Sequence, residues 1–149
     1  MLTYQDVSRL FSKVSGIKEE KIRFHTVSSQ AGAKQPKGLF VPISEESGTL
    51  QKAISNGAVA ALWPEGVQVP SYAPNHFPIF YAQDNLKGLE EIMNSYYNYL
   101  TQHEETRERT KFIFPDKGLL NEADETYDIA VMAEKINGFG GNISKAGEE

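Results

Sequence analysis

Cysteine is absent from this chain of 149 residues. The absence excludes disulfide bonds, a zinc site with thiolate ligands and a cysteine nucleophile, and it fits a reducing cytosol. Long apolar runs are absent too, since none approaches the roughly 20 residues that a bilayer demands. Charges at Asp6, Arg9 and Lys13 interrupt the N-terminal segment, which therefore lacks the pattern of a signal peptide. We expect a soluble, cytoplasmic protein with no membrane partner.

Clusters of lysine and arginine are also missing, and the formal net charge is −5. Because neutralising nucleic-acid phosphates needs clustered cations, we expect no nucleic-acid partner. The hydrophobic content of 40% and charged content of 23% are those of an ordinary globular protein. The length allows one domain with a real core and a tail.

The central stretch of the chain runs from Gly38 to Trp63. Residues 38–43 form a short apolar run that predicts a buried strand, and 58–63 form another. Between them, residues 49–56 have helical spacing, with Thr49 as the N-cap and Gly57 supplying a left-handed C-terminal position. A strand, helix and strand joined by short links predict two parallel strands of one sheet.

The residues before this unit predict a helix and a strand. Residues 3–15 carry an apolar face at helical spacing, with a capping box formed by Thr3 and Asp6 and an end at Gly16. Residues 22–27 alternate as in a half-buried strand. His25 falls on its polar face, where a solvated surface histidine is the simpler interpretation than a ligand or a base.

The residues after this unit predict an extended passage, a strand and a long helix. Four prolines between Pro64 and Pro78 forbid a helix there. Residues 79–82 predict a strand. Asp84 is then expected to cap a helix, whose apolar face reaches Leu100 through Leu86, Leu89, Met93, Tyr96 and Tyr97.

Two polar loops follow predicted strands and are candidates for binding. Residues 28–37 read SSQAGAKQPK, and residues 44–48 precede a helix. Open α/β sheets bind ligands at the carboxyl ends of their strands, so these loops predict the rim of a ligand site. Without further context, we favour a flexible connection as the interpretation of the first loop.

The amino-acid composition of the chain changes near residue 101. We predict a domain over 1–101, a charged linker and helical extension over 102–137, and a Gly-rich disordered tail over 138–149. The extension contains a possible strand at 112–114 and a helix at 121–136. The fold class expected is α/β, a small mixed sheet in two or three layers with flanking helices.

Three motifs in this order resemble the N-terminal domain of the Mur ligases, in the branch that adds the third residue or the terminal dipeptide to the peptidoglycan precursor. Residues 36–41 read PKGLFV, residues 53–58 read AISNGA, and residues 84–89 read DNLKGL. The resemblance covers residues 24–100. It implies a domain that holds the UDP end of a UDP-MurNAc-peptide or related UDP-sugar, in the cytoplasmic synthesis of the cell wall.

Carried over by position, the resemblance implies two groups of ligand-binding residues. Ser28, Ser29 and Gln30 match a D-S-R loop, with serine in place of the Asp and glutamine in place of the Arg. Ser47, Gly48 and Thr49 fall roughly where a D-G-H segment of the family approaches the same ligand, in a shortened stretch that has no histidine. No catalytic residue, metal ligand or cofactor is implied for this chain.

Catalysis by the family needs a P-loop for ATP, and no G-x-x-x-x-G-K-[ST] pattern occurs. We therefore predict a non-catalytic module, accessory or regulatory, in which activity is conceivable only with a partner chain. The alternative is a protein-interaction module on the same scaffold, binding another protein or itself through residues 64–78 and 121–136. An unrelated hydrolase or transferase ranks last, because the histidines and acidic residues show no nucleophile and base spacing.

Overall fold

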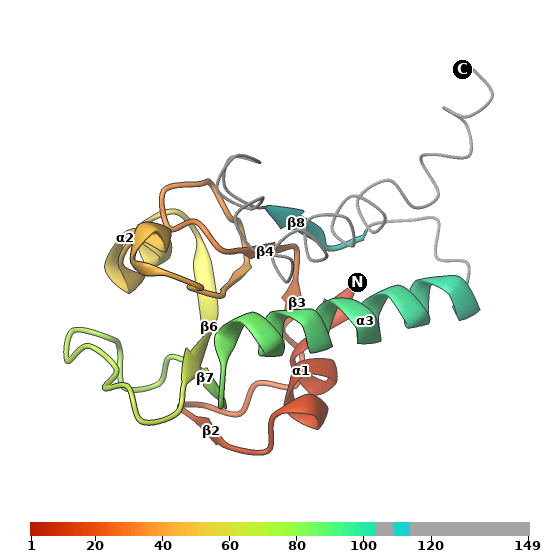
Figure 1. The fold of residues 1–149 in the computed structure, drawn as a ribbon, viewed down its shortest axis with the longest axis horizontal. Helices are drawn as coiled ribbons and strands as arrows, with labels where there is room; N and C mark the ends of the chain where they lie inside the picture. Colours follow the sequence, from red (N-terminus) through yellow and green to blue (C-terminus); the bar gives the residue numbers. More distant parts are fainter. Residues whose placement is uncertain (104–108, 114–149) are drawn as a thin grey trace.

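The computed structural model describes residues 1–103 and 109–113, and it is a mixed α/β structure (Figure 1). A six-stranded sheet runs in the order β2-β7-β6-β5-β4-β8, and β1 pairs with β3 apart from it. The strands are β1 (Leu2–Thr3), β2 (Val14–Ser15), β3 (Arg23–Phe24), β4 (Thr26–Ser28), β5 (Gly38–Phe40), β6 (Ala58–Pro64), β7 (Ile79–Ala82) and β8 (Lys111–Ile113). The helices are α1 (Tyr4–Leu10), the 3₁₀ turn η1 (Glu45–Ser47), α2 (Leu50–Ser55) and α3 (Asn85–His103). The predicted α/β class is confirmed.

The predicted central unit is confirmed as β5, α2 and β6, with the two strands parallel and adjacent. The Thr49 hydroxyl accepts a hydrogen bond from the Lys52 N–H at 3.2 Å and so caps α2. Gly57 adopts φ +115°, and a Cβ there would lie 2.7 Å from the Gln35 carbonyl oxygen. This position therefore requires glycine. The strand β5 ends at Phe40, three residues before the predicted end.

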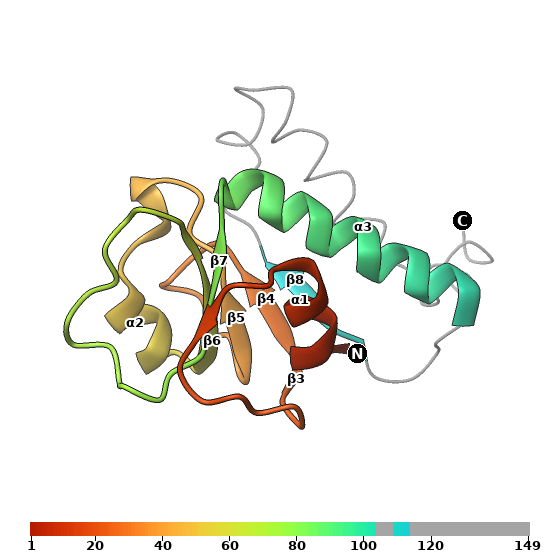
Figure 2. The same ribbon diagram turned by 90° about the horizontal axis from the view of Figure 1, so that it is seen from below.

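The sheet is covered on both faces, which gives three layers (Figure 2). Helix α2 packs on one face over Phe40, Ala61 and Ile79. Helices α1 and α3 pack on the other, over residues that include Leu39, Leu62 and Phe80. Right-handed crossovers explain the division, since the chain crosses the sheet in one direction through α2 and returns in the other through α3. Burial on both faces explains the continuous apolar runs of β5 and β6.

The predicted helix over 3–15 is confirmed at its start and wrong at its end. Thr3 and Asp6 form the predicted capping box, but α1 ends at Leu10 rather than near Gly16. Val14 and Ser15 instead pair antiparallel with β7 at the sheet edge. The backbone of Val14 belongs to a strand, but its side chain packs against the same core as α1 and α3. This shared packing explains why Val14 fits the apolar spacing of the predicted helix.

The predicted strand over 22–27 is two strands in different sheets. Residues 23–24 pair with β1, and residues 26–28 pair with β5 and β8. His25 stands between them and is half-buried rather than solvated. The predicted alternation fails at Val27, which is buried like both its neighbours because β4 lies inside the sheet.

The predictions for residues 64–100 are confirmed. No helix forms across residues 65–78, and β7 spans Ile79–Ala82. The Asp84 carboxylate accepts from the N–H groups of Leu86 and Lys87 at 2.8 and 3.2 Å, as expected of the N-cap of α3. Leu89, Met93, Tyr96 and Leu100 are buried in the core, while Leu86 and Tyr97 pack against it. In the described parts of the chain, none of the helices is long and apolar enough to cross a membrane.

Residues 111–113 belong to the sheet although the sequence places them in an extension. Strand β8 pairs parallel with β4, which confirms the predicted strand at residues 112 and 113. The Thr110 hydroxyl accepts from the Leu2 N–H at 2.8 Å and donates to the Phe24 carbonyl at 2.6 Å. Phe114, the predicted helix over 121–136 and the predicted tail over 138–149 lie outside the described residues. The division of the chain at residue 101 stays a prediction.

Candidate functional site

The carboxyl ends of the five parallel strands β4 to β8 meet at one edge of the sheet. The chain moves across the sheet from β4 to β7 and then returns to the other side of β4 with β8. The order of strands therefore switches at β4, which lies between β5 and β8. Sheets of this kind bind ligands at the carboxyl edge, beside such a switch.

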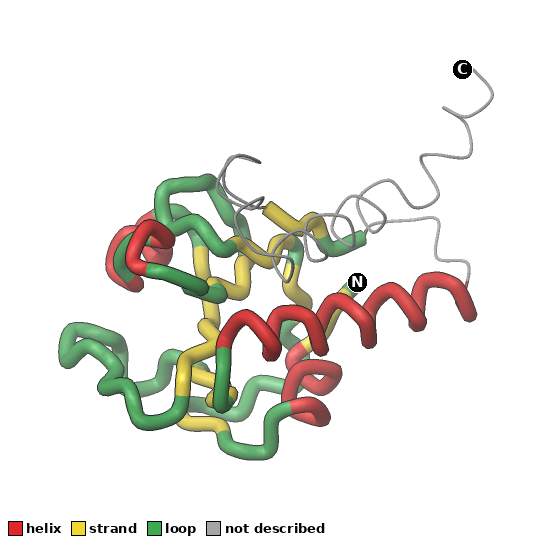
Figure 3. Tube along the Cα trace, in the orientation of Figure 1, coloured by secondary structure: helices red, strands yellow, loops and turns green. Residues whose placement is uncertain are grey.

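The two candidate loops leave this edge side by side (Figure 3). The Ala31 N–H donates to the Ser47 carbonyl at 2.7 Å, and the Asn56 side-chain amide donates to the Ala31 carbonyl at 2.8 Å. A Cβ on Gly48 would lie only 2.8 Å from the Cβ of Ala31. The sequence expectation that both loops contribute to one rim agrees with this contact.

The first group of candidate residues is largely enclosed. The Ser28 hydroxyl donates to the Gln30 carbonyl at 2.9 Å and accepts from the Gln30 N–H at 3.0 Å. Ser29 is 1% exposed, and its N–H donates to the Ile113 carbonyl of β8. The Ser29 hydroxyl is buried with no hydrogen-bond partner in the described residues. Gln30 alone of the three is half-buried.

The second group shapes the neighbouring loop. The buried Ser47 hydroxyl accepts from the N–H groups of Ile43 and Ser44 at 3.0 and 3.3 Å. Gly48 adopts φ +95° and ψ −166°, and Thr49 caps α2. Gly48 and Thr49 are exposed. Among the six candidates, ligand contact is therefore open mainly to Gln30, Gly48 and Thr49. The hydroxyls of Ser28 and Ser47 hold the loops in place, and that of Ser29 is buried without a partner among the described residues.

A pocket of about 600 Å³ lies beside the second loop, at the carboxyl ends of β5 and β6 and the start of α3. We call it the edge pocket. Of the six candidates, Gly48 lines it. Its wall is mostly apolar, and its lining consists of Pro42, Ile43, Ser44, Glu45, Gly48, Trp63, Pro64, Val67, Asp84, Asn85 and Leu86. The size and apolar character are typical of small-molecule sites.

Two lining residues of the edge pocket carry polar atoms without partners in the described chain. Asn85 is 5% exposed, and its amide donates to the carbonyls of Pro42 and Leu62 at 2.8 and 2.9 Å, whereas its Oδ1 has no partner. The Trp63 Nε1 is also buried and unpartnered. These two residues thus carry one unpaired acceptor and one unpaired donor, both of them buried. Sequence reasoning missed both, because Trp63 fitted a strand and Asn85 fitted a helix start.

Lys34 and Lys37 belong to the first loop itself. Lys52 of α2 lies next to the first loop, since its Nζ is 3.9 Å from the position of a Cβ on Gly32. No group of three or more histidine or acidic residues that could hold a metal occurs within the described ranges.

One side chain with a shifted pKa lies in the core, away from this edge. Burial raises the pKa of Tyr4 above its ordinary 10.0, with Lys18 opposing and Glu20 adding to the shift.

Comparison with known protein families finds no family model that matches this chain, and comparison with curated proteins finds no match either. The fold itself defines the class, which is a mixed α/β domain. Its sheet is mainly parallel, and the order of the strands reverses at β4.

Proposed function

We propose that this chain is a non-catalytic module that binds a UDP-sugar precursor of the UDP-MurNAc-peptide type, with an accessory or regulatory role in cell-wall precursor metabolism. The observation that carries the proposal is the contact between residues 28–31 and 44–49 at the carboxyl edge of the β5–α2–β6 unit. The three motifs of the Mur-ligase resemblance fall on this unit and on the start of α3. The proposal thus joins a sequence resemblance to an edge suited to ligands.

The edge pocket suits the uracil ring of such a ligand. A uracil edge presents carbonyl acceptors beside one N–H donor, and two residues that line the pocket, Trp63 and Asn85, carry a buried unpaired donor and a buried unpaired acceptor, which the ring reaches only if the pocket wall opens. Supplying both partners removes the cost of two buried polar atoms left unpaired. Lys52 offers an ammonium group for the phosphates beside the first loop, where the family has an Arg and this chain has Gln30.

Thermal unfolding with UMP, UDP and a UDP-sugar tests the proposal. A ligand at 100 times its Kd stabilises the native state by about 2.7 kcal/mol, so the midpoint must rise with concentration. We expect uridine nucleotides to raise it and the corresponding adenosine nucleotides to leave it unchanged. No rise at millimolar concentrations of any uridine nucleotide would contradict the proposal.

Two variants place the ligand within the site. Trp63→Phe keeps an aromatic ring and removes the N–H, so it should weaken UMP and UDP alike. Lys52→Gln should weaken UDP binding more than UMP binding, because the substitution removes a cation that can pair with the second phosphate of UDP. Lys21→Gln is the matched control, since Lys21 is exposed and precedes β3, outside the linings of the edge pocket. Equal affinity in Trp63→Phe and the control would remove the edge pocket from the proposal.

A protein-interaction role on the same scaffold is the second candidate. Exposed apolar side chains favour it, since Ile17 is 51%, Val67 53% and Tyr72 47% exposed. Val67 and Tyr72 belong to the Pro-rich passage between β6 and β7, and the Ile17 N–H donates to the backbone carbonyl of His76 in that passage. Sedimentation over a range of concentrations tests self-association. A sedimentation coefficient that rises with concentration and falls back in Val67→Ser would favour this role.

A further inference from the structure

Helix α2 is followed by an asparagine and a glycine, Asn56 and Gly57, and the fold uses both residues. Gly57 has φ +115°, and a Cβ there would lie 2.7 Å from the Gln35 carbonyl oxygen, so glycine is the residue that fits. The Asn56 side-chain amide donates to the carbonyls of Ala31 at 2.8 Å and of Lys52 at 3.0 Å. The Asn-Gly pair is therefore built into the point where α2 meets the first loop.

An asparagine followed by a glycine is chemically labile in an unfolded chain. The backbone nitrogen of the glycine attacks the Cγ of the asparagine, ammonia leaves, and a five-membered succinimide ring forms. Water then opens the ring to aspartate or isoaspartate, so the net reaction consumes water and releases ammonia. Glycine favours this reaction because it has no side chain to obstruct the attacking nitrogen. Asn56 and Gly57 supply both reacting groups without a cofactor or a further reactant.

The folded backbone holds Asn56 away from this reaction. The ring closes only when the Gly57 nitrogen and the Asn56 side chain lie on the same side of the Cα–C bond, and at ψ 6° they point apart. The Gly57 N–H is engaged with the Ile54 carbonyl at 3.1 Å, and the Asn56 amide is held by its two carbonyl acceptors. The reaction therefore requires the end of α2 to separate from the first loop.

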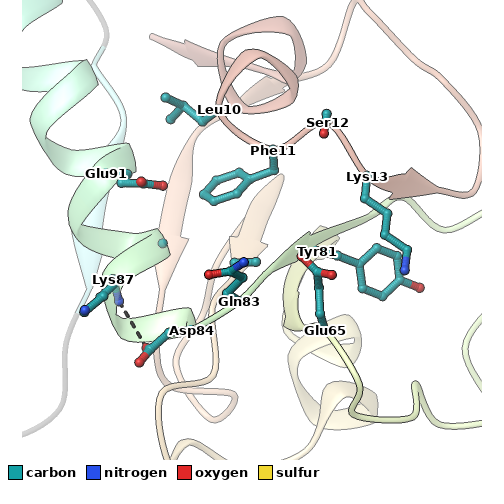
Figure 4. A pocket seen from close by; sticks show the side chains of 12 residues that line it. Leu10, Phe11, Ser12, Lys13, Glu65, Tyr81, Gln83, Asp84, Lys87 and Glu91 are labelled. Carbon is teal, nitrogen blue, oxygen red and sulfur yellow. Dashed lines mark hydrogen bonds between the residues drawn. The ribbon is translucent and has the colours of Figure 1, made fainter.

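The product of the reaction weakens the same contact. A carboxylate suits the start of α3, where that of Asp84 accepts from the Lys87 N–H (Figure 4). At the end of α2, the groups that the Asn56 amide meets are the carbonyl oxygens of Ala31 and Lys52, which offer a carboxylate no donor. A negative charge is also unfavourable at the C-terminus of a helix. Deamidation thus removes the hydrogen bond that joins α2 to the first loop.

We propose that Asn56 is a site of spontaneous deamidation, which the closed rim holds back and which then releases the first loop from α2. The rim here is the first loop, the loop at residues 44–48 and the end of α2, in mutual contact. Because ammonia is lost, the change is a one-way switch of the rim. The proposal rests on these contacts alone, so it stands whether or not the rim binds uridine nucleotides.

Peptide mass spectrometry of the full chain, incubated at mildly alkaline pH, tests the site and its gate. The reference is a synthetic peptide of residues 53–60, which contains the same Asn-Gly pair. In urea we expect Asn56 to deamidate at the rate of the peptide, and in the native protein about tenfold more slowly or less. Native deamidation as fast as that of the peptide would overturn the gate, and an intact Asn56 in urea would overturn the site.

Gly48→Ala tests whether the rim is the gate, because the added Cβ would press against Ala31. Gly66→Ala is the control, since nothing lies within 4 Å of a Cβ on Gly66. The two variants are compared under conditions in which circular dichroism shows both to be folded. We expect Asn56 to deamidate several-fold faster in Gly48→Ala than in the control. Equal rates in the two variants would overturn the rim as the gate.

Asn56→Asp tests the effect of the product, since it places a carboxylate at the same position. Native-state hydrogen exchange of the Ala31 N–H, which donates to the Ser47 carbonyl at 2.7 Å, reports on the contact between the loops. We expect this exchange to be about tenfold faster in Asn56→Asp. Asn94→Asp adds the same charge on the exposed side of α3 and should leave the exchange unchanged. Unchanged exchange in Asn56→Asp would overturn the release of the first loop.

Discussion

The backbone N–H of Ala31 donates to the carbonyl of Ser47 at 2.7 Å and so joins the loop after β4 to the turn before α2. Gly48 follows at once, with no side chain to fill the space next to the Ala31 methyl. The Asn56 side chain then holds the Ala31 carbonyl from the far end of α2. The rim of the candidate site is therefore a single hydrogen-bonded unit formed by two loops and a helix.

Gly48→Ala should disrupt this unit. The backbone at φ +95° and ψ −166° is accessible to glycine alone, and a Cβ would overlap Ala31 at 2.8 Å. We expect a loss of about 2–4 kcal/mol in the free energy of unfolding, measured by urea denaturation. Gly66→Ala is the matched control, because Gly66 also has a positive φ of +85° but nothing lies within 4 Å. It should lose about 1 kcal/mol. Equal losses in the two variants would show that the Ala31 contact contributes nothing.

The sequence predicted the sheet and its helices well where local pattern and tertiary packing agree. The unit from β5 to β6 and the helix α3 have their caps, apolar faces and strand runs in the expected places. The errors fall where long-range pairing decides the backbone. Val14 fits the apolar spacing of α1, yet it pairs with Phe80, 66 positions away, which no local pattern reveals. His25 divides one predicted strand because its two halves pair with different partners.

Asn85 links the candidate site to the fold. Its amide donates to the carbonyl of Pro42, which follows β5, and to the carbonyl of Leu62, which lies in β6. These two hydrogen bonds hold the start of α3 against the ends of both strands. Asn85→Ala leaves one buried and one part-buried carbonyl without these donors and should lower the free energy of unfolding by about 2 kcal/mol. Asn85→Asp should cost more, since it adds a charge facing those carbonyl oxygens. Asn94→Ala on the exposed side of α3 is the control, and we expect it to be neutral or slightly stabilising. A neutral Asn85→Ala in the same urea titrations would contradict this role.

The candidate site was predictable only in outline. The two loops were identified because polar residues follow predicted strands, and the structure brings them into contact. The sequence did not reveal that Ser28 and Ser47 spend their hydroxyls on their own loops, since that depends on backbone geometry. The edge pocket was missed because the unpaired polar atoms of its lining residues belong to Trp63 and Asn85, whose positions fit ordinary secondary structure. Those atoms stand out because they are buried without hydrogen-bond partners, which the residue types alone do not indicate.

Tyr4 gives the fold a dependence on alkaline pH. Burial raises its pKa above 10.0 in the folded protein, where its ring packs 5.0 Å from that of Phe80. The neutral phenol is favoured by folding, so this contribution is complete below pH 10 and is lost as the pH rises through the folded pKa. Tyr4→Phe should remove that part of the alkaline loss. Unfolding free energies of both proteins between pH 8 and 11 measure it, and parallel curves would contradict the assignment.

Thr110 tests whether residues 109–113 are part of the folded unit. Its hydroxyl joins Leu2 of β1 to Phe24 of β3, and its N–H donates to the Tyr96 hydroxyl of α3 at 3.0 Å. Thr110→Val keeps the volume but leaves a buried N–H and a buried carbonyl unpaired, so we expect a loss of about 2 kcal/mol in urea denaturation. Thr101→Val, on the exposed surface of α3, is the control.

The pairing of β8 also predicts that a chain ending at residue 101 is less stable than one ending at residue 113, because β4 loses its partner β8. Equal stability of the two chains would instead support a domain boundary at residue 101.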